Sequence, residues 1–266
     1  MSRKVAKYLT VMVVTARSGL AYPFDTFARA GFMAVVIFVF IQLWSAAFQL
    51  TGQGSVAGYD LPRMIWYLVL TETIIMSCPR VSSEVDQQVK AGDLAYALNR
   101  PYNFGLFHYA QYMGKAALTL PLNFLVGGAL ALVFAGAPVV PGYAWPAIGL
   151  AAILAMTLNF VVEFSIGLLG FWFEDTFAFF WIYQKIVFTF GGLFLPLELF
   201  PEPLRQIAAV LPFTSISYGP GRLAATFALS RFIETLGTQV FWLIAVGLLA
   251  MLLYRRGVRR INVNGG

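Results

Sequence analysis

The feature that most constrains this chain is a stretch of 47 residues, Ala116 to Val162, that contains no charged side chain. A helix needs about 20 mainly apolar residues to cross the roughly 30 Å hydrocarbon core of a bilayer. The stretch is therefore too long for one crossing. Its middle is interrupted by four residues typical of turns: Pro138, Pro141, Gly142 and Pro146. We expect a hairpin of two membrane helices.

The rest of the chain has the same character. Of its 266 residues, 59% are hydrophobic and 11% charged, whereas about a quarter of the residues in a soluble domain are charged. The predicted fold is all-α, a polytopic membrane protein with six transmembrane helices. The second helix is interrupted by Arg63 and Glu72. The expected crossings are residues 28–50, 62–79, 113–136, 146–172, 176–197 and 234–254.

Basic residues indicate the direction of these crossings, because Lys and Arg accumulate in cytoplasmic loops. With six crossings both termini share one side, and 14 of the 18 basic residues then fall on that side, including the cluster RRGVRR near the C-terminus. We therefore expect both termini in the cytoplasm. The net charge of +6 is explained by topology, and no nucleic-acid partner is required.

Residues 3–20 are expected to form an amphipathic helix that lies on the inner leaflet. The apolar positions follow helical spacing: Val5, Leu9, Met12, Val13, Ala16 and Leu20. Basic residues occupy other positions around the same helix. The alternative is an ordinary basic flank before the first crossing.

The cytoplasmic loop 79–111 is the longest polar segment. A helix is predicted from Ser82 to Lys90, ended by Ala91-Gly92, and a second short segment is expected to stop at Asn99-Arg100-Pro101. The cap and breaker residues favour an ordered surface over a simple solvated connector.

Five prolines divide the extracytoplasmic segment 197–233 and the residues just before it into apolar pieces that are too short to span a membrane. Pieces of this length are typical of re-entrant or interfacial helices. Both a cap over a translocation path and a plain extracellular lid fit this pattern.

The order of these features resembles the membrane subunits of ABC-2 type ABC exporters. The basic N-terminal helix is similar to that family's connecting helix. The loop sequence EVDQQVKAGDLAYALNRPYN is similar to its acidic helix followed by Gly, Leu, Arg-Pro and Asn. The segment GGLFLPLELFPEPLRQIAAVLPFT and the ending YRRGVRRINVNGG also resemble the family, so the resemblance covers essentially the whole chain.

This resemblance implies a single ABC-2 transmembrane domain over residues 1–266, in a bacterial cytoplasmic membrane. Two permease subunits, alike or different, would enclose a path between them, and two separate ATPase subunits would bind beneath. The chain contains no G-x-x-x-x-G-K-[ST] motif, so ATP and magnesium are expected on the ATPase. The residues that match the family's ATPase-coupling region are Glu84, Asp86, Gln87, Lys90, Gly92, Asp93 and Leu94.

Two acidic residues lie inside predicted crossings, where a charge costs at least about 2.5 kcal/mol on insertion scales. Glu72, beside Thr71, is a candidate for the path of a cationic substrate, because the second crossing lines the path in the resembled family. Glu163 is a weaker candidate, since the fourth crossing is peripheral there. For both residues the alternative is a structural role, protonated or hydrogen-bonded to a neighbouring helix.

Aromatic residues in the fifth crossing are available for an apolar substrate or a partner, although such residues more often face lipid. We include Phe180 and Phe188 among the path candidates. Crossings one and five form the permease interface in the resembled family. The small residues Gly191 and Gly192 would allow close helix contact there.

Catalysis by this chain is not expected. One cysteine, Cys78, one histidine, His108, and no G-x-S-x-G motif provide neither a nucleophile with its base nor a metal cluster. The alternatives to an exporter permease are an ATP-independent secondary transporter or channel and, less favoured, a lipid-modifying enzyme. The substrate is not indicated by the sequence.

Overall fold

The computed structural model describes residues 3–21, 23–52, 54–91 and 101–264. Among these residues the regular elements are helices, and the only β pairing is an isolated bridge between Val56 and Tyr59. The all-α prediction is confirmed. The α-helices are α1 Arg3–Leu20, α2 Pro23–Thr51, α3 Leu61–Ser77, α4 Ser82–Lys90, α6 Phe104–Phe134, α7 Trp145–Leu168, α8 Phe177–Phe190, α9 Glu202–Ala209, α10 Tyr218–Ala225 and α11 Leu229–Asn264. The 3-10 helices are η1 Gly142–Ala144, η2 Leu169–Phe171, η3 Leu197–Leu199 and η4 Pro212–Ser215.

Five helical stretches in the described part of the chain are long and apolar enough to cross a membrane. They are Thr26–Thr51, Leu61–Lys90, Phe104–Phe134, Gly142–Phe171 and Leu229–Arg260. The fifth expected crossing, residues 176–197, contains only the 14-residue helix α8, which spans about 21 Å at 1.5 Å per residue. Its helix ends at Gly191 because Gly192 adopts a φ of 72°, which a right-handed helix cannot accommodate. The structure therefore supports five crossings and one shorter apolar helix.

Two helices extend beyond their predicted ends. α6 begins at Phe104, nine residues before the expected start at 113, because the side chain of Asn103 accepts a hydrogen bond from Leu106 N at 3.0 Å and caps the helix. The expected polar loop 79–111 was therefore too long. α11 begins at Leu229 and continues through the arginine cluster to Asn264, because arginine is itself a good helix former.

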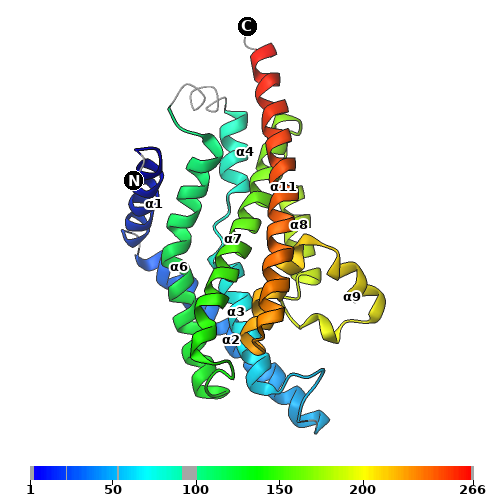
Figure 1. Ribbon diagram of the computed structural model, residues 1–266. Coiled ribbons are helices and arrows are strands. Elements are labelled where there is room, and N and C mark those ends of the chain that lie inside the picture. The colour runs from blue at the N-terminus through cyan, green and yellow to red at the C-terminus, as the bar shows by residue number, and fades with distance from the viewer. Residues whose placement is uncertain (1–2, 22, 53, 92–100, 265–266) are drawn as a thin grey trace.

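α3 lies at the centre of the bundle, in contact with α2, α6 and α10 (Figure 1). Asp60 caps its start by accepting a hydrogen bond from Arg63 N at 2.9 Å. Tyr67, Leu68 and Val69 are fully buried, so all sides of this helix face protein. A helix in that position needs no lipid-facing stripe, which explains why its apolar pattern is weak in the sequence.

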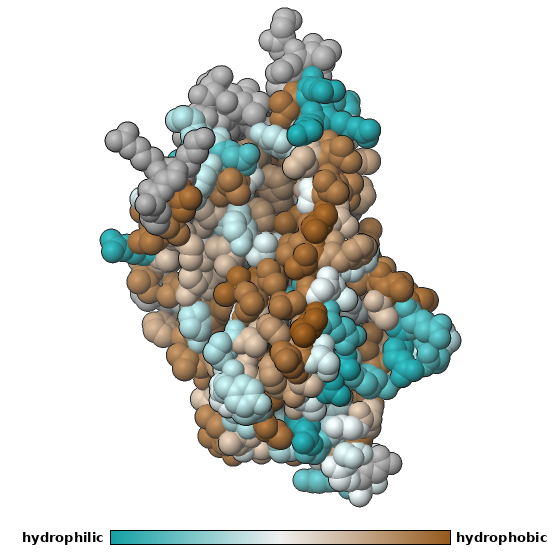
Figure 2. All heavy atoms as spheres, in the orientation of Figure 1, coloured by the Kyte–Doolittle hydropathy of each residue, from teal (hydrophilic) through white to brown (hydrophobic). Residues whose placement is uncertain are grey.

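The outer surface of the bundle is apolar. Exposed apolar side chains line α2, such as Phe32 and Leu43, and α11, such as Phe241 and Leu248. Figure 2 shows brown surface over the middle of the molecule, with hydrophilic patches at the C-terminal end of α11 and around α9. Both chain ends and α4 lie toward the upper end of Figure 1. This distribution fits a protein surrounded by lipid.

The predicted helix over residues 3–20 is confirmed as α1, which packs against α6. Contact is close at Gly114, where a Cβ atom would lie 2.9 Å from Thr15 Cβ. Val5, Leu9 and Val13 are exposed on α1, and their four-residue spacing forms one apolar face. The position of α1 on a membrane surface stays a prediction.

The segment before α11 is broken into η3, α9, η4 and α10, as the prolines predicted. α10 packs against α3, and Tyr218 N bonds to Gly191 O at 3.0 Å. Glu198 accepts a hydrogen bond from the hydroxyl of Tyr218 at 2.7 Å and lies 3.7 Å from Arg222. These contacts fix part of the segment against the bundle. Re-entry of these helices into the membrane stays a prediction.

Candidate functional site

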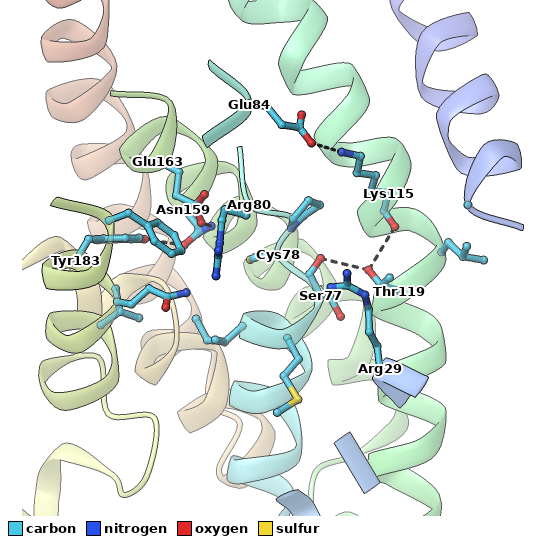
Figure 3. A pocket seen from close by; sticks show the side chains of 18 of the residues that line it. Arg29, Ser77, Cys78, Arg80, Glu84, Lys115, Thr119, Asn159, Glu163 and Tyr183 are labelled. Atoms are coloured by element: carbon cyan, nitrogen blue, oxygen red, sulfur yellow. Dashed lines mark hydrogen bonds and ion pairs between the residues drawn. The ribbon is translucent and has the colours of Figure 1, made fainter. Parts of the chain in front are cut away.

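A cavity of about 970 Å³ opens between two groups of helices. Residues of α1, α2, α3 and α6 line one side, and residues of α7 and α8 line the other. The junction between α3 and α4 borders it as well, through residues 78–80. Figure 3 shows polar side chains from several of these elements directed into this space. The cavity therefore collects residues from distant parts of the sequence.

Four basic residues line the cavity: Arg29, Arg80, Lys115 and Lys185. The Arg80 guanidinium lies 4.4 Å from the centre of the Phe180 ring. Lys185 Nζ lies 5.2 Å from the Trp181 ring and 5.8 Å from the Phe188 ring. Both geometries are within the range of cation–π contacts.

Two acidic residues line the same cavity, and both are engaged. Glu84 on α4 forms a 2.5 Å salt bridge with Lys115 on α6. Glu163 on α7 accepts hydrogen bonds from Val81 N at 2.9 Å, from Ser82 N at 3.4 Å and from the Asn159 amide at 3.2 Å. Both contacts connect the start of α4 to the bundle, and Figure 3 shows the one between Glu84 and Lys115.

The bonds to Glu163 replace a missing helix cap. α4 begins after Val81, whose own side chain makes no capping hydrogen bond. The first N–H groups of a helix have no partner within it, and the Glu163 carboxyl group supplies one from α7. Glu163 is only 5% exposed, so its neighbours, rather than water, satisfy it. The structural interpretation of Glu163 is thus favoured by its contacts.

After Glu163 along the chain, the contact between α4 and the end of α7 is very close. At Gly167 a Cβ atom would lie 2.7 Å from both Ser82 O and Val85 Cβ, and at Gly170, in the following η2, it would overlap the Asp86 carboxyl group. Glu163, Gly167 and Gly170 follow i, i+4, i+7 spacing and so lie on one helical face. We call these three residues the α4 seat.

The helix predicted for the coupling region is confirmed as α4, Ser82–Lys90. Asp86 and Lys90 form a salt bridge of 2.6 Å along it, and Gln87 and Lys90 are exposed. Glu84 instead faces Lys115 at the cavity. Gly92, Asp93 and Leu94, like the segment expected to stop at residues 99–101, lie wholly or partly outside the described residues.

The path candidates are divided between two places. Phe180 and Phe188 of α8 line the cavity. Glu72 is 4% exposed and Thr71 fully buried in α3, and neither lines the cavity. The Thr71 hydroxyl donates to Leu68 O at 3.1 Å within its own helix. A role for Glu72 in the passage of a substrate stays a prediction.

Gly191 and Gly192 pack closely within the chain itself. Gly191 O accepts a hydrogen bond from Ser217 Oγ at 2.6 Å, and Gly192 O accepts one from the Tyr67 hydroxyl. A Cβ atom at Gly192 would lie 2.9 Å from that hydroxyl oxygen. These glycines therefore allow α8 and the following turn to approach α3 and α10. Their role at a permease interface stays a prediction.

From the sequence, the basic residues of the cavity indicated only the direction of the crossings. Arg29, Arg80, Lys115 and Lys185 are separated along the chain, and only packing brings them together. The sequence does contain a signal for a shared basic site, because each of these residues lies in or near the predicted cytoplasmic half of a different crossing. Within the described ranges, no three His, Cys, Asp or Glu side chains gather to hold a metal ion.

A bundle of apolar helices with a polar cavity among them, and a short helix seated at one end, defines a polytopic membrane protein suited to transport. Residues 32–265 match the family described as ABC-2 family transporter protein. The chain belongs to this family of ABC transporter membrane components, which associate with ABC ATPases. None of the curated proteins compared with the chain matches it.

Proposed function

We propose that this protein is the permease subunit of an ATP-driven exporter that moves its substrate out of the cytoplasm or the inner leaflet. The observation that carries this proposal is the placement of α4. The α4 seat fixes this helix to α7, and the Glu84–Lys115 salt bridge joins it to the wall of the cavity. A movement of α4 would therefore reach the cavity through direct contacts.

The ATPase would bind at the exposed side of α4. Gln87 and Lys90 are exposed there, and Gly92, Asp93 and Leu94 follow directly in the sequence. Glu84 and Asp86 would act from within the permease, since their carboxyl groups already face Lys115 and Lys90. ATP and magnesium bind to the ATPase in this proposal, which places α4 and both termini in the cytoplasm of a bacterium.

The fifth expected crossing, residues 176–197, would be completed by α8 together with residues 191–199, which continue from it as turns and η3. A second permease subunit, identical or related, would then cover α2 and α8, whose outward sides carry exposed apolar residues such as Phe32 and Trp181. Lipid covers the rest of the apolar surface.

Purification from the native membrane tests the proposal. The tagged wild-type chain should retain an ATPase that carries a phosphate-loop motif, and the double variant Gln87→Arg/Lys90→Glu should lose most of it. Arg205→Glu is the matched control, because Arg205 is an exposed charged residue of α9, on the far side of α8 from α4 in Figure 1. A wild-type chain that retains no ATPase, or a double variant that retains as much as wild type, would contradict the proposal.

A further inference from the structure

The lining of the cavity combines basic and apolar side chains. Of its four basic residues, Lys115 is paired with Glu84. Arg80 and Lys185 form no salt bridge with any of the described residues, and each rests on an aromatic ring. A ring contacts one face of a cation and leaves its N–H groups directed elsewhere. Two cations are therefore available to a bound anion.

The acidic residues do not cancel this charge. Glu84 is balanced by Lys115 at 2.5 Å. Glu163 accepts hydrogen bonds from the backbone N–H groups of Val81 and Ser82 and from the amide of Asn159, and it interacts at longer range with Arg80. A cationic ligand would meet carboxyl groups that are already engaged and would face Arg80 and Lys185. These charges favour an anion over a cation as a ligand of the cavity.

Apolar residues of the lining lie close to both cations along the chain. Along α8, Lys185 is followed by Val187 and Phe188, and Leu193 comes after the helix ends. Along α3, Ile75 and Met76 precede Arg80, which lies at the α4 end. On α8 the apolar lining lies on both sides of Lys185, because Phe180 also lines the cavity. A ligand that contacts both kinds of side chain has an acidic group and an apolar chain.

We infer that this cavity binds an amphipathic anion, with its phosphate or carboxylate group between Arg80 and Lys185 and its apolar chain along Phe188 and Leu193. The inference rests on the proposed function, since it names the substrate class of the same permease. It also differs from the expectation of a cationic substrate at Glu72, because Glu72 does not line the cavity. Planar guanidinium groups suit phosphate and carboxylate particularly well.

Binding of fluorescent lipids to the purified full-length chain in neutral detergent tests the inference without any ATPase. NBD-labelled phosphatidate should bind saturably, and NBD-labelled phosphatidylcholine should bind at least about tenfold more weakly, since loss of one charge-assisted contact already has an effect of this size. Arg80→Gln/Lys185→Gln should lose at least about tenfold in phosphatidate affinity. Arg80→Lys/Lys185→Arg should retain most of it, which separates charge from packing.

The control variant is Arg205→Gln/Arg259→Gln, which removes two exposed positive charges outside the cavity. It should bind phosphatidate as wild type does, and matched thermal melting curves show that each variant is folded. Inorganic phosphate at millimolar concentration should not displace the lipid, because it lacks the apolar chain. Displacement by phosphate would overturn the amphipathic part of the inference.

Equal binding of the two lipids, or full binding by Arg80→Gln/Lys185→Gln, would overturn the inference itself. Because no ATPase is present, such a result leaves the exporter assignment intact. Conversely, the absence of an ATPase in the native purification leaves lipid binding unaffected.

Discussion

Replacement of Glu163 by alanine is expected to loosen α4 without unfolding the bundle. The substitution removes the acceptor for Val81 N and Ser82 N, which lie in a buried position at the start of α4. An unsatisfied buried N–H group costs about 1–3 kcal/mol. The bond to Val81 is short and the bond to Ser82 is long, at 2.9 and 3.4 Å, so we estimate a total of about 2 kcal/mol.

A local cost of about 2 kcal/mol corresponds to a roughly thirtyfold increase in the open population of α4. Hydrogen exchange measured by mass spectrometry should show this increase in peptides that cover residues 82–90, while peptides from α11 exchange as in wild type. Glu163→Gln keeps one acceptor oxygen and should show a smaller effect.

Glu72→Ala is the matched control, because Glu72 is also a buried glutamate but forms no hydrogen bond to α4. It should leave exchange in residues 82–90 unchanged. The reasoning is refuted if Glu163→Ala leaves α4 as protected as in wild type, or if Glu72→Ala exposes α4 to the same extent.

Three further predictions concern other contacts. Gly167→Ala should displace α4 and increase its hydrogen exchange because the new Cβ would lie 2.7 Å from Val85 Cβ, whereas Gly149→Ala, in open space on the same helix, should leave exchange unchanged and raise the melting temperature slightly. Burial and Glu198 raise the pKa of the Tyr218 hydroxyl, so its stabilising contribution is present below the unfolded pKa of about 10 and is lost as pH rises through the folded value. Ultraviolet titration should show one fewer high-pKa tyrosine in Tyr218→Phe, and an unchanged titration would contradict this. Asn103→Ala should lower helix stability by about 1 kcal/mol, seen as faster exchange in the first turn of α6, and equal exchange would argue against the cap.

Local patterns in the sequence were sufficient for several elements. Residues 3–20 and 82–90 form helices at the predicted positions because apolar spacing and helix-end signals act over a few neighbouring residues. The hairpin of α6 and α7 follows from the 47 uncharged residues and the prolines in their middle. The resemblance also led to the ABC-2 family, which the match over residues 32–265 confirms.

Some helix ends depend on the geometry of single residues, which the apolar pattern of the sequence does not describe. The cap at Asn103 starts α6 earlier than its apolar stretch indicates. Gly192 stops α8 after 14 residues, although apolar residues continue beyond it. In both cases one residue with a specific backbone or side-chain geometry decides the end, whereas hydropathy averages over many residues.

The sequence by itself determined that the chain lies in a membrane, because its apolar content leaves no soluble alternative. It did not determine the site. Glu163 became the cap of α4, and Arg80 and Lys185 came to share one cavity, only through packing of α3, α7 and α8. Spacing along a chain reports neighbours on one helix, but the face that each helix turns toward the others depends on how all of them fit together.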